Sequence, residues 1–212
     1  MSGNPESLAI LLGELLCARV CHDLAGPIGA VGSGAELLAD EMGPGNEALA
    51  LLVDSAAAAG SRLRYLRLAL GGGGKAMRPQ ELHQTTIEYL ASAASGARPS
   101  LDWQDGVGEP WEPGAARLLM NLILTAHDCL PRGGALTVRG RPAPRRLATV
   151  TAEGRGAMLG EAALQLTEAA PTTYGPRGAQ GRYAVLLAAQ MGIAVRVEKE
   201  DALVSFVAER KD

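Results

Sequence analysis

The sequence predicts an α plus α+β protein, in which a helical hairpin over residues 1–74 is followed by an α/β sandwich over residues 75–212. Three observations predict this fold class. Apolar residues keep helical spacing from Leu8 to Leu38, and a second apolar series alternates steps of three and four from Leu49 to Leu70. After the four glycines at 71–74, short stretches typical of strands alternate with helical ones.

The first helix is expected to begin near residues 5–7 and to run to about residue 41. Gly43-Pro44-Gly45 then ends it, and Asn46 suits the N-cap of the second helix. The second helix carries a coiled-coil seam, formed by Leu49, Leu52, Ala56, Ala59, Leu63, Leu66 and Leu70. Because two antiparallel helices cannot cover both apolar stripes, we expect a second copy of the chain to complete a four-helix bundle. The sequence therefore predicts a homodimer.

The elements beyond residue 75 are expected to form an α+β sandwich of helices beside an antiparallel sheet. The predicted helices cover residues 79–95, 113–130, 159–168 and 178–191, and the predicted strands cover 100–103, 136–139, 147–152, 193–198 and 203–208. Pro79 suits the first position of its helix.

Composition excludes several classes of protein. The net charge is −3, and it divides into −4 over residues 1–74 and +1 over residues 75–212, so neither part is basic enough to indicate a nucleic-acid partner. Three cysteines make no disulfide framework, which favours a reducing compartment. No uncharged apolar run reaches the length of about 18 residues that a membrane span requires. We therefore expect a cytoplasmic protein that does not enter a membrane.

The stretch from Cys21 to Gly29 contains the candidate functional residue, His22. Helical spacing places small side chains around this histidine and leaves the imidazole open to solvent; the residues that share its face are Ala18, Arg19, Ala25, Gly26, Gly29 and Ser33. Interior glycines weaken a helix by roughly 1 kcal/mol each relative to alanine, so access to the ring is the expected compensation. Pro27 cannot donate to the carbonyl of Asp23 and is expected to bend the helix there.

This stretch resembles the phosphoacceptor helix of two-component signalling proteins, in which a histidine is followed by an acidic residue and, five positions on, by proline. The longer string over residues 17–38 is similar to the ChpT-type histidine phosphotransferases of alphaproteobacteria; residues 21–27, 29–30 and 36–38 match their pattern. Gly26 keeps the small size that this pattern requires but stands where that family has Ser, and Ser33 stands where it has Asn. The resemblance implies that His22 is the phosphoacceptor, that Asp23 is its catalytic neighbour, and that residues 1–74 are the dimerisation and phosphoacceptor domain.

Residues 75–212 resemble the ATP-binding domain of histidine kinases, with its nucleotide motifs degenerate. Thr125 stands where the kinases have the asparagine expected to hold magnesium, and Ala152 stands where they have the aspartate that contacts adenine. Arg182-Tyr183 replaces small residues that let phosphates approach a helix N-terminus. No lid long enough to cover ATP is apparent between Gly156 and Gly178. The resemblance therefore implies an ATPase-like sandwich that binds no nucleotide and no other cofactor.

Without ATP, the phosphoryl group is expected to come from the aspartyl phosphate of a receiver domain and to leave for another receiver. The predicted partners are thus the receiver domains of a hybrid histidine kinase and of response regulators, with His22 as the carrier. Asp23 is expected to favour the reactive tautomer or to help accept its proton. Magnesium is expected from the receiver, because no acidic cluster accompanies His22 in this sequence.

The remaining candidate site residues are expected to contact the partner. They are Ala18, Arg19, Gly26, Gly29, Ser33 and Arg62. Folding the hairpin brings Arg62 and Arg67 near His22, where they and Arg19 could place positive charge beside a phosphoryl group. Alternatively, the arginines of the second helix lie near its C-terminus because the helix dipole favours cations there.

Three alternatives stay open. A lone His-Asp pair on a helix usually has no function, the chain could be an ATP-dependent histidine kinase, or it could be a non-enzymatic dimeric scaffold for receivers. His83 and His127 are interpreted as structural, and Cys17, Cys21 and Cys129 as apolar packing residues. Cys17, Cys21 and His22 lack both the spacing and the fourth ligand of a zinc site.

Overall fold

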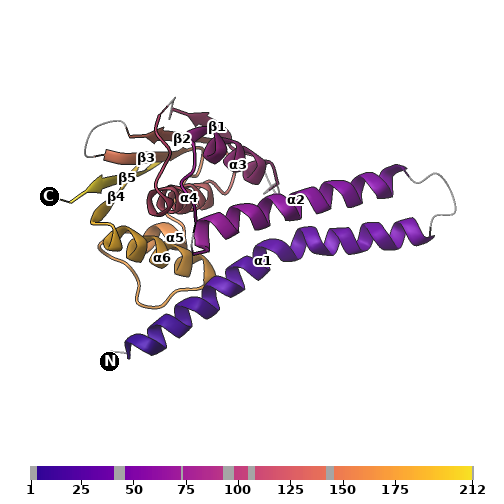
Figure 1. The fold of residues 1–212 in the computed structure, drawn as a ribbon, viewed down its shortest axis with the longest axis horizontal. Helices are drawn as coiled ribbons and strands as arrows, with labels where there is room; N and C mark the ends of the chain where they lie inside the picture. Colours follow the sequence, from indigo (N-terminus) through magenta and orange to yellow (C-terminus); the bar gives the residue numbers. More distant parts are fainter. Residues whose placement is uncertain are drawn as a thin grey trace.

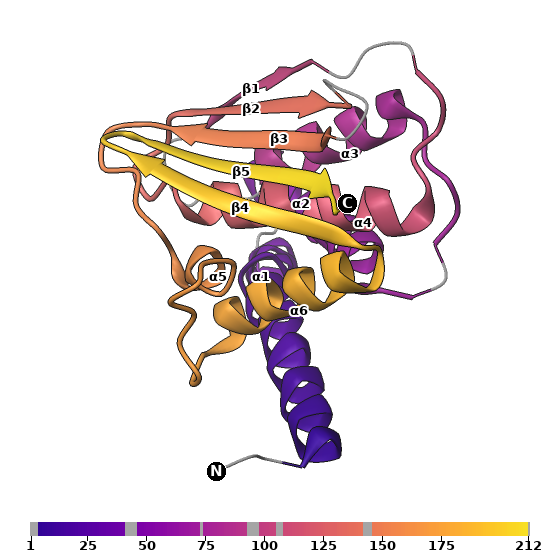
Figure 2. The ribbon, with the colours of Figure 1, turned by 90° about the vertical axis from the view of Figure 1, so that its left-hand side faces the viewer.

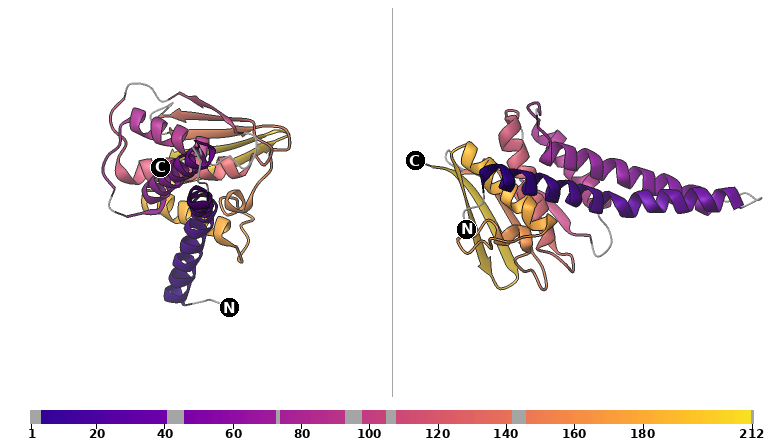
Figure 3. Two further views of the ribbon diagram at one scale, coloured as in Figure 1. Left: turned by 90° about the vertical axis from the view of Figure 1, so that its right-hand side faces the viewer. Right: turned by 90° about the horizontal axis from the view of Figure 1, so that it is seen from below.

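The protein is described here from a computed structural model, which covers residues 4–40, 46–72, 74–92, 98–104, 108–141 and 146–211. It confirms the predicted fold class: two long helices form a hairpin, and the rest of the chain forms an α/β sandwich. Figure 1 shows the hairpin extending away from the sandwich, and Figure 3 shows the same extension from two other sides.

The hairpin consists of α1 (Pro5–Asp40) and α2 (Asn46–Leu70), close to the predicted bounds. Pro27 lies inside α1. Figure 1 shows α1 changing direction near its middle, as the missing hydrogen bond of an interior proline leads us to expect. The N-terminal half of α1 lies against α6 (Pro176–Gln190), so the phosphoacceptor candidate is carried past the sandwich.

The sheet has five strands in the order β1-β2-β3-β5-β4. Their bounds are β1 (Ser100–Trp103), β2 (Ala135–Gly140), β3 (Arg146–Glu153), β4 (Ile193–Glu200) and β5 (Leu203–Arg210). The prediction of an antiparallel sheet is wrong for β1, which pairs parallel to β2. The helix between these two strands explains the difference, because it provides the crossover that parallel neighbours require.

Helices cover one face of this sheet, as Figure 2 shows. Besides α6 they are α3 (Pro79–Ser92), α4 (Pro113–Asp128) and the short α5 (Glu161–Leu164). Helix α5 is shorter than predicted, since the chain turns back after Leu164 and the Gln165 side chain donates to the carbonyl of Pro171. No helix of the described ranges has the length and apolar character needed to cross a membrane.

The C-terminal turns of α2 belong to the same hydrophobic core as the sandwich. Tyr65, Leu66 and Ala69 are buried in one cluster with residues of α4 and the sheet. The Tyr65 hydroxyl donates to the Met120 carbonyl at 3.0 Å, and the Asn121 amide donates to the Ala69 carbonyl at 2.7 Å. These bonds fix α2 on α4. The division into domains at residue 74 stays a prediction, and the core crosses it.

Helices α5 and α6 pack with unusually close backbones at Gly181. A Cβ atom at this position would overlap the carbonyl of Ala162 in α5, a rigid backbone neighbour. Glycine is therefore required for α5 to lie directly against α6.

We predict that Gly181→Ala lowers the free energy of unfolding by about 1–3 kcal/mol, because the added methyl group overpacks the α5–α6 contact. Gly60→Ala is the matched control: Gly60 is also helical, has nothing within 4 Å of its Cβ position, and is expected to gain about 0.5–1 kcal/mol from better helix propensity. Urea unfolding at one protein concentration measures both. Equal effects in the two variants would contradict the close packing of α5 on α6.

Candidate functional site

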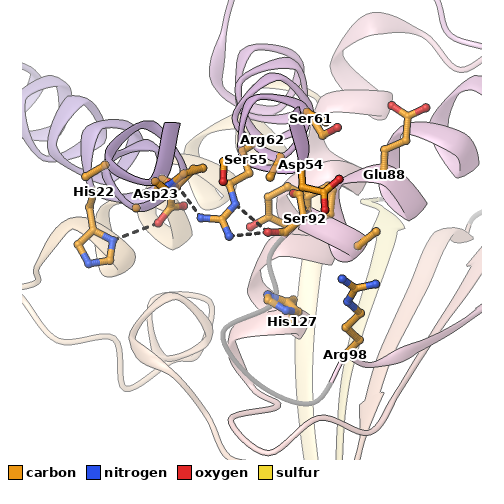
Figure 4. Close-up of a pocket in the computed structure, with 18 of the residues that line it drawn as sticks. His22, Asp23, Asp54, Ser55, Ser61, Arg62, Glu88, Ser92, Arg98 and His127 are labelled. Atoms are coloured by element: carbon orange, nitrogen blue, oxygen red, sulfur yellow. Dashed lines mark hydrogen bonds and ion pairs between the residues drawn. The ribbon is translucent and has the colours of Figure 1, made fainter. Parts of the chain in front are cut away.

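His22 lies on the bent part of α1 with its side chain 74% exposed. Its Nδ1 atom is 3.2 Å from Oδ1 of Asp23. Its Nε2 atom makes no hydrogen bond to any residue that the structure describes. The imidazole thus presents one nitrogen to solvent while the other faces a carboxylate (Figure 4).

The small face expected around His22 is present in the structure. Its exposed members are Ala18, Gly26, Gly29 and Ser33. A Cβ atom built at Gly26 or Gly29 would meet nothing within 4 Å, so neither glycine is demanded by packing inside this chain. The small, exposed residues beside the imidazole therefore leave the ring open to approach by another protein.

Arg19 is not part of this face, and the expectation from helical spacing is wrong on this point. Its residue is only 3% exposed. Arg19 Nε donates to Oδ2 of Asp23 at 2.8 Å, and Nη1 donates to Oδ2 of Asp128 at 3.0 Å. Burial lowers the pKa of Arg19, but the carboxylates of Asp128 and Asp23 raise it by more, so the guanidinium stays charged. Asp128 turns Arg19 inward because it offers a second, buried carboxylate.

Arg62 contacts the bend itself. Its Nη1 donates to the backbone carbonyl of Asp23 at 2.8 Å. This carbonyl lacks its helical hydrogen bond, because Pro27 has no backbone N–H to donate. Its Nε donates to the carbonyl of Ser92, the last residue of α3, at 3.2 Å. Arg62 therefore supplies donors to two carbonyls that lack a helical partner. Arg67, by contrast, is exposed and does not line the groove described next.

An open groove of about 1080 Å³ runs beside His22 between the hairpin and the sandwich. Sequence reasoning missed the lining residues that come from the sandwich, which include Arg98, His127, Asp128 and Arg177. Figure 4 shows Arg98 and His127 on the side of the groove away from His22. One signal was available, because an aspartate at a helix C-terminus opposes the helix dipole and needs another reason to be there.

His127 is not simply structural in position, since it lines the same groove as His22. Burial lowers its pKa from the ordinary value of 6.5, and Asp128 counteracts this in part. A neutral ring is therefore favoured, and its Nδ1 has no hydrogen-bond partner among the described residues. The ring of Tyr89 meets it edge-on, with centroids 6.1 Å apart.

The interpretation of the cysteines as packing residues is confirmed for Cys129 only. Cys129 is buried, and burial raises the pKa of its thiol to about 11. Cys17 and Cys21 are exposed, although Arg19 between them is buried and Val20 packs against the core. Within the described ranges, no three His, Cys, Asp or Glu side chains are grouped so that they could hold a metal ion.

The position of the degenerate nucleotide motifs is filled by internal hydrogen bonds. Gln180 donates to the Asn121 carbonyl and to Asn121 Oδ1, at 3.0 and 3.1 Å, and the Thr125 hydroxyl donates to the Asn121 carbonyl at 2.9 Å. All three residues are fully buried, and so is Ala152. These polar groups bond to one another, although Oε1 of Gln180 has no hydrogen-bond partner among the described residues.

Comparison with known proteins assigns the chain to a class and then to a family. Residues 80–203 match the family model of the histidine phosphotransferase C-terminal domain. Protein phosphotransferase ChpT of Brucella abortus (strain 2308) is 32% identical over 213 residues, covering 97% of this chain and 99% of that protein. A bacterial phosphotransferase solved at 1.7 Å is 31% identical and superposes with a TM-score of 0.79, covering 95% of this chain and 97% of that one.

These matches define a phosphotransferase. The chain belongs to the family of ChpT-type histidine phosphotransferases.

The two carbonyl contacts of Arg62 generate a prediction for stability. Arg62→Ala is expected to lower the free energy of unfolding by about 1–3 kcal/mol, because it leaves the carbonyls of Asp23 and Ser92 unpaired. Pro27→Ala restores a helical donor to the Asp23 carbonyl, so the same Arg62→Ala change should cost about 1 kcal/mol less in that background. Urea unfolding of the four proteins at one concentration measures this coupling.

The matched control is Arg64→Ala, since Arg64 is exposed and forms only a surface ion pair with Glu88. It should change stability by about 0.5 kcal/mol or less, and equally with either residue at position 27. A cost of Arg62→Ala that is the same with and without Pro27 would contradict the carbonyl assignment.

Proposed function

We propose that this chain is the histidine carrier of a multistep phosphorelay and that it shuttles a phosphoryl group between receiver-domain aspartates through His22. The observation that carries the proposal is the geometry of His22. Its Nδ1 faces Asp23, and its exposed Nε2 has no partner within the described structure. This arrangement suits a nucleophile that meets a second protein.

In the proposed step, the lone pair of Nε2 attacks the phosphorus atom of an aspartyl phosphate on a receiver. The bond between phosphorus and the aspartyl oxygen breaks, and the receiver's carboxylate leaves with the electron pair. Positive charge then develops on the imidazole, next to its Nδ1–H. Asp23 lies beside that hydrogen with a side chain only 14% exposed, so its negative charge stabilises the product in a poorly solvated position. The reverse step delivers the group to the next receiver.

Magnesium is proposed to come from the receiver. Neutralising a phosphoryl group in transfer requires a cation, and the carboxylate next to His22 is already engaged, as is that of Asp128. Asp23 and Asp128 both accept hydrogen bonds from Arg19. The chain's own contribution is therefore the nucleophile and its orientation.

We propose that the sandwich binds no ATP, in agreement with its degenerate motifs. Asn121, Thr125 and Gln180 are bonded to one another in the interior. The close contact of α5 with Gly181 of α6 brings protein backbone against the helix where phosphates would approach in a kinase. Both observations favour a carrier over an ATP-dependent histidine kinase.

We also propose that the chain acts as a homodimer in the cytoplasm. Several large apolar side chains of the hairpin are exposed in the single chain, namely Leu8, Ile10, Leu11, Ile28, Leu37, Leu49, Leu51, Val53 and Leu63. Leu49 and Leu63 belong to the predicted coiled-coil seam, so a second hairpin is the occupant that fits. Three free cysteines suit a reducing compartment.

The test is phosphate flow between two receiver domains, followed with radiolabelled phosphate. We predict that His22→Ala stops the flow completely, because the attacking nitrogen is lost, and that His83→Ala leaves it unchanged. Flow that persists in His22→Ala would contradict the proposal and favour a scaffold. Label that appears on the wild-type protein from ATP alone would instead identify a kinase.

A further inference from the structure

Arg19 connects the phosphoacceptor helix to the sandwich through two carboxylates. Its Nε and Nη1 atoms donate to Oδ2 of Asp23 and to Oδ2 of Asp128, at 2.8 and 3.0 Å. The side chains are nearly buried, with 4% of Arg19, 14% of Asp23 and 10% of Asp128 exposed. A guanidinium presents its donors in one rigid plane, so two such bonds fix where it lies.

Asp128 is held by a rigid element. It is the last residue of α4, whose residues from Leu118 to Ala126 are all buried. A carboxylate at this end of a helix gains nothing from the helix dipole. Its bond to Arg19 is therefore its main interaction in the described structure. Through this bond, α4 fixes the position of the Arg19 side chain of α1.

Arg19 in turn orients Asp23. One carboxylate oxygen of Asp23 accepts from Arg19, and the other is the one that faces His22 Nδ1 at 3.2 Å. The Asp23 backbone is held independently by Arg62. With Oδ2 fixed, rotation of the Asp23 carboxylate is restricted, and Oδ1 stays where it can accept a hydrogen bond from Nδ1–H of His22. A hydrogen on Nδ1 means that the lone pair is on Nε2.

From this chain of contacts we propose that Asp128 is a positioning residue for phosphotransfer: through Arg19 and Asp23 it sets the tautomer of His22 and keeps Nε2 as the nucleophile. The inference rests on the proposed function of His22. It assigns to the sandwich a role in the chemistry of the hairpin, although no atom of Asp128 touches the reacting group.

The test measures the tautomer and the reactivity of His22 without any receiver. Nitrogen-15 NMR of histidine-labelled protein reports which ring nitrogen carries the hydrogen, and His22→Ala assigns the signal. Phosphoramidate is the chemical phosphoryl donor: Nε2 forms a bond to phosphorus, the phosphorus–nitrogen bond of the donor breaks, and ammonia leaves. The rate is measured at mildly alkaline pH by mass spectrometry.

We predict that Asp128→Asn shifts His22 towards the Nε2–H tautomer that free histidine favours, and slows its phosphorylation by about tenfold. Asp128→Glu, which keeps the carboxylate, should restore most of the rate. Asp102→Asn is the matched control, because Asp102 is an exposed aspartate of β1 outside the groove. It should leave the tautomer and the rate unchanged.

A folded Asp128→Asn protein with the wild-type tautomer and rate would overturn the inference, since a purely structural bond would leave both unaffected. If Asp128→Asn does not fold, Arg19→Lys decides in the same way: it keeps the buried charge but cannot bridge two carboxylates in one plane. Failure of the proposed function is distinguishable, because a wild-type protein that reacts with phosphoramidate at His22 but exchanges no phosphate with receivers would contradict that proposal alone.

Discussion

The structure around His22 depends on hydrogen bonds that hold both the side chain and the backbone of Asp23. Arg19 donates to its carboxylate and Arg62 donates to its backbone carbonyl, so one residue receives hydrogen bonds from two charged donors. Hydrogen bonds that involve a charged group are stronger than neutral ones, and these are poorly exposed to water. A bent helix would otherwise leave Asp23 free to move. The exposed His22 therefore lies next to a residue whose position is fixed.

The same contacts explain why the hairpin and the sandwich form one unit. Arg19 reaches Asp128 at the end of α4, Arg62 reaches Ser92 at the end of α3, and Tyr65 reaches Met120 inside α4. Inside the sandwich, the side chains of Asn121, Thr125 and Gln180 are bonded to one another. The sandwich thus holds the part of α1 that carries His22, through contacts at the ends of α3 and α4.

Periodic patterns in the sequence predicted the fold well, but they did not predict individual contacts between residues that are far apart in the sequence. Spacing and residue size predict the bounds of the long helices, the order of the strands along the chain, the bend at Pro27 and the exposure of His22, but not the bounds of α5. The partners of Arg19 could not be predicted, because Asp128 lies far away in sequence and meets Arg19 only through the packing of α1 on the sandwich. The parallel pairing of β1 depends on a crossover that alternation alone does not reveal. The sequence predicted that Arg62 lies near the histidine, and it does. Its acceptors could not be predicted, because they are the backbone carbonyls of Asp23 and Ser92, and only the folded structure brings both within reach of Arg62.

The most direct test of this account is to identify the atom that carries the phosphoryl group. The wild-type protein is incubated with a phosphorylated receiver domain and examined by phosphorus-31 NMR under alkaline conditions, in which phosphohistidine persists. If Asp23 accepts a hydrogen bond from Nδ1 of His22, as the structure places the two groups, the signal will be that of a phosphoryl group on Nε2 of His22. This signal will be absent from His22→Ala. A phosphoryl group on Nδ1 of His22, or on any other residue, would contradict the account.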